Sequence, residues 1–124
     1  MNFSLVCLIG IISTIPFGLA FLLAPEAISS IYGVAHWNPG TTSITRLFGA
    51  VLLYVGGACF AMKDSTDRTV QQRGAWTFAV VSVAAMLVAL HSATTGTANS
   101  LMWSTVALYV FFTVAWGSIA LRKN

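Results

Sequence analysis

Charged and strongly polar residues divide the chain into long apolar stretches. Residues 1–25 carry no charge, and a second apolar stretch covers about residues 44–62. After the polar segment 63–73, the next Lys, Arg, Asp or Glu is Arg122, which leaves a run too long for one membrane crossing. The turn-forming sequence TTGTANS at 94–100 divides that run in two. The pattern therefore predicts apolar segments at about 4–23, 44–62, 75–93 and 101–121.

Each segment is expected to be a transmembrane helix. About 20 apolar residues rising 1.5 Å each cross a hydrocarbon core of roughly 30 Å. The runs lack the strict two-residue alternation of membrane barrel strands, and a helix satisfies its own backbone polar groups in lipid. The predicted fold is all-α, a four-transmembrane-helix bundle that forms a single integral membrane domain over residues 1–124.

Composition supports a membrane location. The chain is 57% apolar and 7% charged, with a mean hydropathy of +0.84. A soluble domain carries about 25% charged residues, so this sequence cannot cover a water-exposed surface. The first segment lacks the basic region that opens a signal peptide, and we expect it to be retained as a helix.

The basic residues predict the orientation. With four spans, the second loop and the C-terminus lie on one side of the membrane, and they contain Lys63, Arg68, Arg73, Arg122 and Lys123. The positive-inside rule makes that side cytoplasmic, so both termini are expected in the cytoplasm of a multi-pass plasma-membrane protein. The net charge of +3 reflects this anchoring, and without a basic stripe no nucleic-acid partner is expected.

The first loop, residues 24–43, is long enough to contain structure of its own. Pro25 suits the first turn of a helix, Glu26 complements the positive end of its dipole, and Gly33 can end it. We predict a short interfacial helix here, with Trp37 at head-group level and a turn at 38–40.

Small residues in the second and third spans predict close helix packing. In the second span they are Gly49, Ala50, Gly56, Gly57 and Ala58, and in the third Ala75, Ala79, Ser82, Ala85 and Ala89. The matching intervals predict a tight seam between these two spans. Cys7 and Cys59 fall near the cytoplasmic ends of their helices, where we expect buried thiols that pack as small hydrophobes; a thiol pair is the alternative.

Ionisable residues gather at the predicted outer face. At a rise of 1.5 Å per residue from the basic residues of the second loop, Arg46 lies about 25 Å and His91 about 27 Å above the inner boundary of the membrane. Glu26 and His36 belong to the same level. Since an arginine in lipid is costly without a partner, we predict a Glu26–Arg46 ion pair, with a snorkelling arginine as the plain alternative.

A sharper hypothesis treats these residues as a ligand site. Arg46, His91 and Tyr109 would then line an outward-opening pocket for an anionic or quinone-like head group. A metal site from His36, His91 and Glu26 is disfavoured, because the sequence lacks HxxxH and CxxC spacings. No metal and no other cofactor is expected.

Catalysis is also disfavoured. The chain has no nucleophile elbow, no phosphate-binding Gly-rich loop, no HExxH motif and only three acidic residues. We expect no catalytic residue and no enzyme activity.

The stretches LLAPEAISSIYG and TRLFGAVLLYVGG, followed by two close-packed spans, resemble small four-helix bacterial inner-membrane proteins of the DoxX-like type. The resemblance implies a bacterial inner membrane. It also implies, for some members, an accessory role in quinone-dependent redox complexes.

Two functions remain open. The first is a structural or accessory subunit that docks other membrane subunits or itself, and the second is a binding or carrier protein for a small amphiphile, lipid or quinone-like, at the outer end. A filled core with Arg46 held by Glu26 would indicate the first, and a pocket reaching His91 or Tyr109 the second. Because few polar side chains fall at mid-depth, the sequence favours the accessory subunit.

Overall fold

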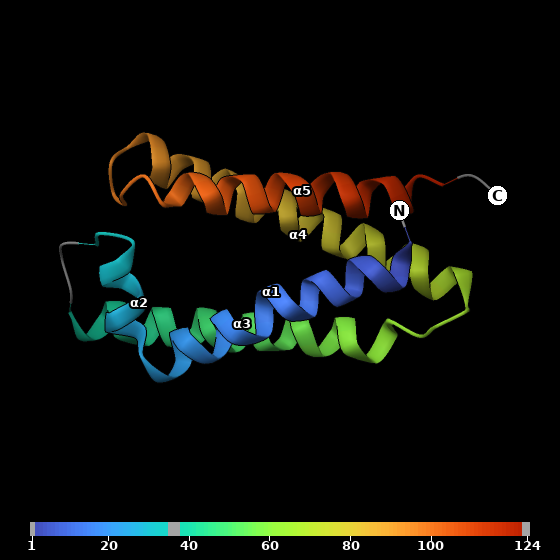
Figure 1. The fold of residues 1–124 in the computed structure, drawn as a ribbon, viewed down its shortest axis with the longest axis horizontal. Helices are drawn as coiled ribbons and strands as arrows, with labels where there is room; N and C mark the ends of the chain where they lie inside the picture. Colours follow the sequence, from blue (N-terminus) through green and yellow to red (C-terminus); the bar gives the residue numbers. More distant parts are fainter. Residues whose placement is uncertain (1, 35–37, 123–124) are drawn as a thin grey trace.

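Four long helices and one short helix make up the chain in the computed structural model, which describes residues 2–34 and 38–122. The long helices are α1 (Phe3–Leu23), α3 (Pro39–Met62), α4 (Arg68–Thr94) and α5 (Met102–Ala120). The short helix α2 (Pro25–Ile31) lies between α1 and α3 (Figure 1). The predicted all-α fold, with four spans and a short helix in the first loop, is confirmed.

The long helices present their large apolar side chains outward. All four are long and apolar enough to cross a membrane. Leu23, Ile44 and Leu47 are 75%, 71% and 66% exposed, whereas a water-soluble fold would avoid so wide an apolar surface. The chain is a small multi-pass membrane protein.

Side-chain caps explain where two helices begin. The Asn38 side chain accepts a hydrogen bond from the Thr41 N–H at 2.9 Å, and Pro39 is the first residue of α3. The Asp67 side chain caps α4 in the same way through the Thr69 N–H at 2.7 Å. Both helices therefore start several residues before the apolar segments predicted from sequence. The turn predicted at 38–40 is wrong, because Asn and Pro here start a helix.

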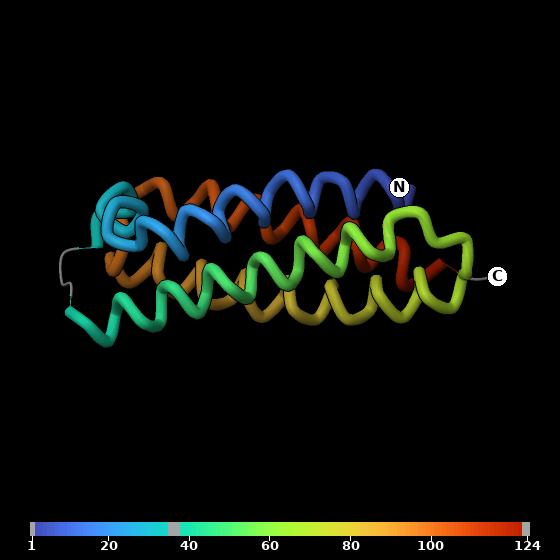
Figure 2. The backbone as a smooth tube through the Cα atoms, turned by 90° about the horizontal axis from the view of Figure 1, so that it is seen from below, coloured from blue at the N-terminus to red at the C-terminus, as the bar shows by residue number. Residues whose placement is uncertain are grey.

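The long helices pack as two antiparallel hairpins. Helix α1 pairs with α3, and α4 pairs with α5, so the bundle has two layers (Figure 2). Helices α3 and α4 follow each other in the chain but make little direct contact. The predicted seam between the second and third spans is therefore wrong, because the small residues of α3 pack on α1 instead.

Glycines allow the close approach of α1 and α3. A Cβ atom on Gly49 would lie 2.7 Å from the Gly18 carbonyl oxygen, and one on Gly18 would lie 2.9 Å from the Gly49 carbonyl oxygen. No side chain fits at either position without moving the helices apart. Gly57, on the same helix as Gly49, is exposed and its Cβ position is open.

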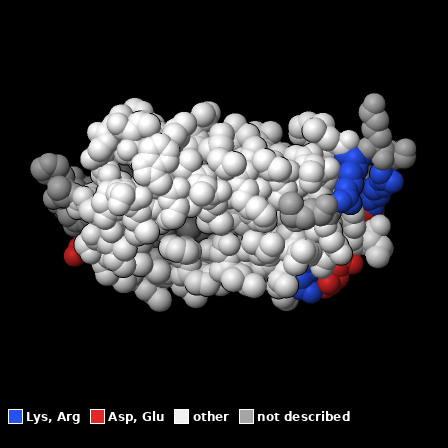
Figure 3. Space-filling view, turned by 45° about the horizontal axis from the view of Figure 1, so that its top comes forward, with Lys and Arg blue, Asp and Glu red and all other residues white. Residues whose placement is uncertain are grey.

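The packed core lies at one end of the bundle, where both hairpins meet. It contains the start of α1, the end of α3, the start of α4 and the end of α5, with Phe3, Cys59, Phe78 and Trp116 among its buried side chains. Cys7 and Cys59 are free thiols buried in this core, as predicted. Their side chains also hydrogen-bond to each other, so the alternative of a thiol pair describes them as well. On the face shown in Figure 3, basic and acidic residues gather at one end, a small acidic spot lies at the other, and the middle is uncharged.

Candidate functional site

A cavity of about 350 Å³ separates the two hairpins. It lies between the packed core at one end and α2 at the other, and every helix contributes to its wall. This volume falls within the roughly 300–1,000 Å³ typical of small-molecule sites. The filled core expected for an accessory subunit is therefore corrected, because the interior contains a space.

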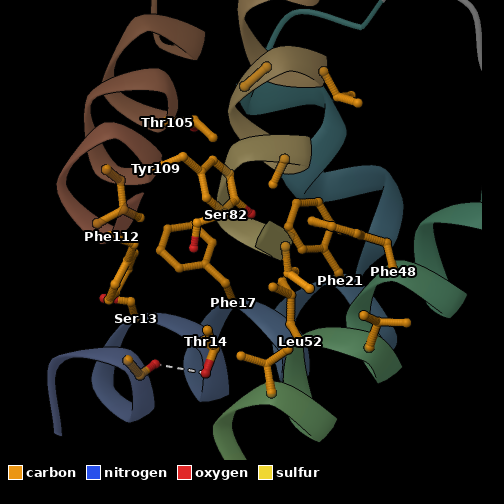
Figure 4. Close-up of a pocket in the computed structure, with 18 of the residues that line it drawn as sticks. Ser13, Thr14, Phe17, Phe21, Phe48, Leu52, Ser82, Thr105, Tyr109 and Phe112 are labelled. Carbon is orange, nitrogen blue, oxygen red and sulfur yellow. Dashed lines mark hydrogen bonds between the residues drawn. The ribbon is translucent and has the colours of Figure 1, made fainter. Parts of the chain in front are cut away.

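One face of each long helix forms the wall, at the three- and four-residue spacing of a helix. On α4 this face consists of Phe78, Val81, Ser82, Ala85, Val88, Ala89 and Ser92. Opposite it, α1 and α3 contribute aromatic and aliphatic side chains, including Phe17, Phe21, Phe48 and Leu52 (Figure 4). The small residues on α4 leave room that the aromatic rings of the opposite hairpin do not fill.

Most polar side-chain groups of the wall are hydroxyls, and the Cys59 thiol and the Trp116 indole N–H are the others. The hydroxyls belong to Ser13, Thr14, Ser29, Tyr32, Ser82, Ser92, Thr105 and Tyr109. The Thr14 hydroxyl donates to the Gly10 carbonyl at 2.7 Å, and the Tyr32 and Thr105 hydroxyls bond to each other at 2.9 Å. Within residues 2–34 and 38–122, the other five hydroxyls make no side-chain hydrogen bond.

The residues after α2 close one end of the cavity. The Asn99 N–H donates to the Tyr32 carbonyl at 2.8 Å, and the Asn99 side-chain amide donates to the Ile31 carbonyl at 2.8 Å. With the Tyr32–Thr105 hydrogen bond, these contacts tie the first hairpin to the second. The opposite end is closed by the packed core, including Trp116, which is 3% exposed.

One long side of the cavity is open. Phe48 and Val51 on α3, and Val81 and Val88 on α4, line the cavity and are also exposed at the molecular surface. Helices α3 and α4 make little contact with each other, so these side chains border an opening between them. In a bilayer this opening faces the lipid.

The predicted outer cluster does not assemble. Glu26, Arg46 and His91 lie toward the α2 end, as their heights predicted, but their side chains are exposed and none lines the cavity. No ion pair joins Glu26 to Arg46 in the part of the chain that the structure describes, so this prediction is corrected. The two helices turn these side chains to the surface, which fits the snorkelling alternative.

Tyr109 is the predicted site residue that lines the cavity. His36 lies outside the described residues. Ser13 and Ser82 were not predicted as site residues, because a serine inside a span usually bonds to its own helix and carries no signal of a site. Their position on the same helix faces as Phe17 and Ala85 was the available indication.

Compared with known proteins, the chain matches no family model, no curated protein and no solved structure. The resemblance to DoxX-like proteins therefore stays a prediction.

Proposed function

We propose that this chain binds or carries a small amphiphile of the bilayer in the cavity between its two hairpins. The main support for this proposal is a cavity of about 350 Å³ with an apolar wall and an opening toward lipid. An engineered apolar cavity of about 150 Å³ is large enough to bind benzene, so this one has room for a considerably larger molecule.

The wall supports an apolar ligand body. Burial of apolar surface contributes about 25 cal/mol per Å², and the aromatic rings of Phe17, Phe48 and Phe112 offer large contact areas. The ligand reaches the site through the bilayer, because hydrogen bonds of Asn99 and Tyr32 close the cavity at the α2 end.

A structural or accessory subunit, docked on other membrane subunits or on itself, is the other candidate. That role calls for a filled core with Arg46 held by Glu26. The cavity and the separate exposure of these two side chains support ligand binding over it. Binding needs no catalytic group, and we propose none.

Mild-detergent purification followed by mass spectrometry of bound small molecules tests the proposal. Ala85 lines the cavity on α4, and its neighbour Ala84 is exposed outside it, so Ala85→Phe and Ala84→Phe form a matched pair. We expect wild type and Ala84→Phe to retain a stoichiometric lipophile and Ala85→Phe to lose most of it. Equal retention by both variants, or only bulk lipid on the wild type, would count against binding in this cavity.

A further inference from the structure

We infer that the ligand is a neutral lipophile whose carbonyl-type oxygen accepts hydrogen bonds from Ser82 and Tyr109 at mid-depth of the membrane. The inference rests on the proposed function and names the chemical class that the same cavity would select. It follows from two hydroxyl groups, their depth and the absence of ionic groups around them.

Ser82 is a buried donor without a partner. It is 7% exposed, lines the cavity, and makes no hydrogen bond within the described residues. In the described ranges, Ser13 and Ser92, which also line the cavity, likewise make no side-chain hydrogen bond, and Thr113 on α5 is a buried hydroxyl without a partner outside the cavity. In contrast, Thr77 donates to the Arg73 carbonyl at 3.0 Å, and Ser118 donates to the Ala115 carbonyl at 2.8 Å. A buried polar group normally has a partner, so Ser82 indicates one that enters the cavity.

Tyr109 offers a second donor in the same cavity. Its side chain is directed into the space between the hairpins, as is that of Ser82 (Figure 4). The Tyr109 hydroxyl has no partner in the described part of the chain, whereas the nearby Tyr32 hydroxyl is occupied by Thr105. A carbonyl oxygen has two lone pairs and can accept from both free hydroxyls at once.

Depth excludes a lipid with an ionic head group at this position. Ser82 lies near the middle of α4 and Tyr109 near the middle of α5, far from both ends of the bundle. No Lys, Arg, His, Asp or Glu is among the lining residues in the described ranges. Burying an ionic group here without a counter-charge would be very costly, so the bound group must be neutral.

The decisive experiment compares three probes of equal chain length: a medium-chain methyl ketone, the parent alkane and the fatty-acid anion. Binding is measured to the full chain in lipid nanodiscs after detergent exchange has depleted native ligand. We expect the ketone to bind about three- to ten-fold tighter than the alkane, the range of one or two hydrogen bonds, and the anion to bind weakest. A methyl ester of the same length separates ester lipids from ketones.

Matched variants assign the hydrogen bonds. Ser82→Ala and Tyr109→Phe each remove a cavity hydroxyl, while Ser104→Ala and Tyr54→Phe remove exposed hydroxyls outside the cavity. We expect the first two to weaken ketone binding about three- to ten-fold and leave alkane binding unchanged. In wild type the infrared C=O band of the bound ketone should lie at lower wavenumber than in either variant.

The outcomes separate the two proposals. If neither ketone nor alkane binds the wild type, the proposed function fails. If ketone and alkane bind equally, or if the wavenumber of the C=O band is the same in wild type and both variants, the hydrogen-bond assignment fails while the proposed function stands. Tighter binding of the fatty-acid anion than of the ketone would overturn the neutral class.

Discussion

The hydroxyl groups of Tyr32 and Thr105 lie 2.9 Å apart and join the residue after α2 to the first turn of α5. Asn99 adds hydrogen bonds to the carbonyls of Ile31 and Tyr32. These contacts are the main polar ties between the two hairpins at the end where the apolar core is absent. They control how closely the cavity is shut at the α2 end.

Removing these ties should loosen the α2 end. We expect Tyr32→Phe and Asn99→Ala each to lower the free energy of unfolding by about 1 kcal/mol, the usual net contribution of a hydrogen bond. Thermal unfolding in detergent measures the change, with Tyr54→Phe as the control, because the exposed Tyr54 hydroxyl makes no hydrogen bond within the described residues. Unchanged midpoints for both variants would mean that these contacts do not hold the hairpins together.

Gly33 has a left-handed backbone, with φ of +72°, and a Cβ atom there would lie 3.1 Å from the Cβ of Asn99. Gly33→Ala should lower the free energy of unfolding by about 1–2 kcal/mol through backbone strain alone, and the contact with Asn99 should lower it further. Gly96 has a similar φ of +71° with open space around it. Gly96→Ala therefore measures the strain by itself, and thermal unfolding of both variants isolates the Asn99 contact.

The α1–α3 hairpin should depend on Gly49. Gly49→Ala forces a methyl group to 2.7 Å from the Gly18 carbonyl oxygen, and we expect a loss of about 1–3 kcal/mol or failure to fold. Gly57→Ala on the same helix meets nothing within 4 Å and should be neutral or slightly stabilising. Size-exclusion profiles and thermal unfolding in detergent compare the two; a similar effect of both would contradict the close helix contact.

Arg46 and Glu26 should be energetically independent. Because both side chains are exposed and unpaired with each other, Arg46→Ala and Glu26→Gln should each change stability by less than about 0.5 kcal/mol. The double variant should equal the sum of the single ones. A coupling energy above about 1 kcal/mol in this cycle would restore the ion pair that the sequence predicted.

The cytoplasmic location of the charged end stays a prediction that cysteine labelling can test. Cys7 and Cys59 are buried, so they should not react with a membrane-impermeant maleimide. Asp64→Cys, in the α3–α4 loop, should be labelled only from the cytoplasmic side of sealed vesicles, and Thr97→Cys, in the α4–α5 loop, only from the opposite side. If each cysteine is labelled only from the other side of the membrane, the predicted orientation is wrong.

Much of the fold was predictable because it depends on local composition. The spans follow from apolar run length, and α2 follows from Pro25, Glu26 and Gly33. The first residues of α3 and α4 were harder to predict. Asn38 and Asp67 were expected in a turn and a polar segment, but they cap helices that extend beyond the apolar runs. Of the candidate site, Tyr109 was predicted, while Ser82 was indicated only by its position on the same helix face as Ala85.

The sequence by itself determined that this chain crosses lipid as four helices, because backbone groups in hydrocarbon must bond within their own segment. Only the tertiary structure decided which helices pair. In lipid, apolar faces gain little from avoiding solvent, so shape governs packing, and Gly49 meets Gly18 of α1 instead of the alanines of α4. That pairing leaves the cavity between the hairpins, turns Ser82 and Tyr109 into it, and places Arg46 and Glu26 on the surface.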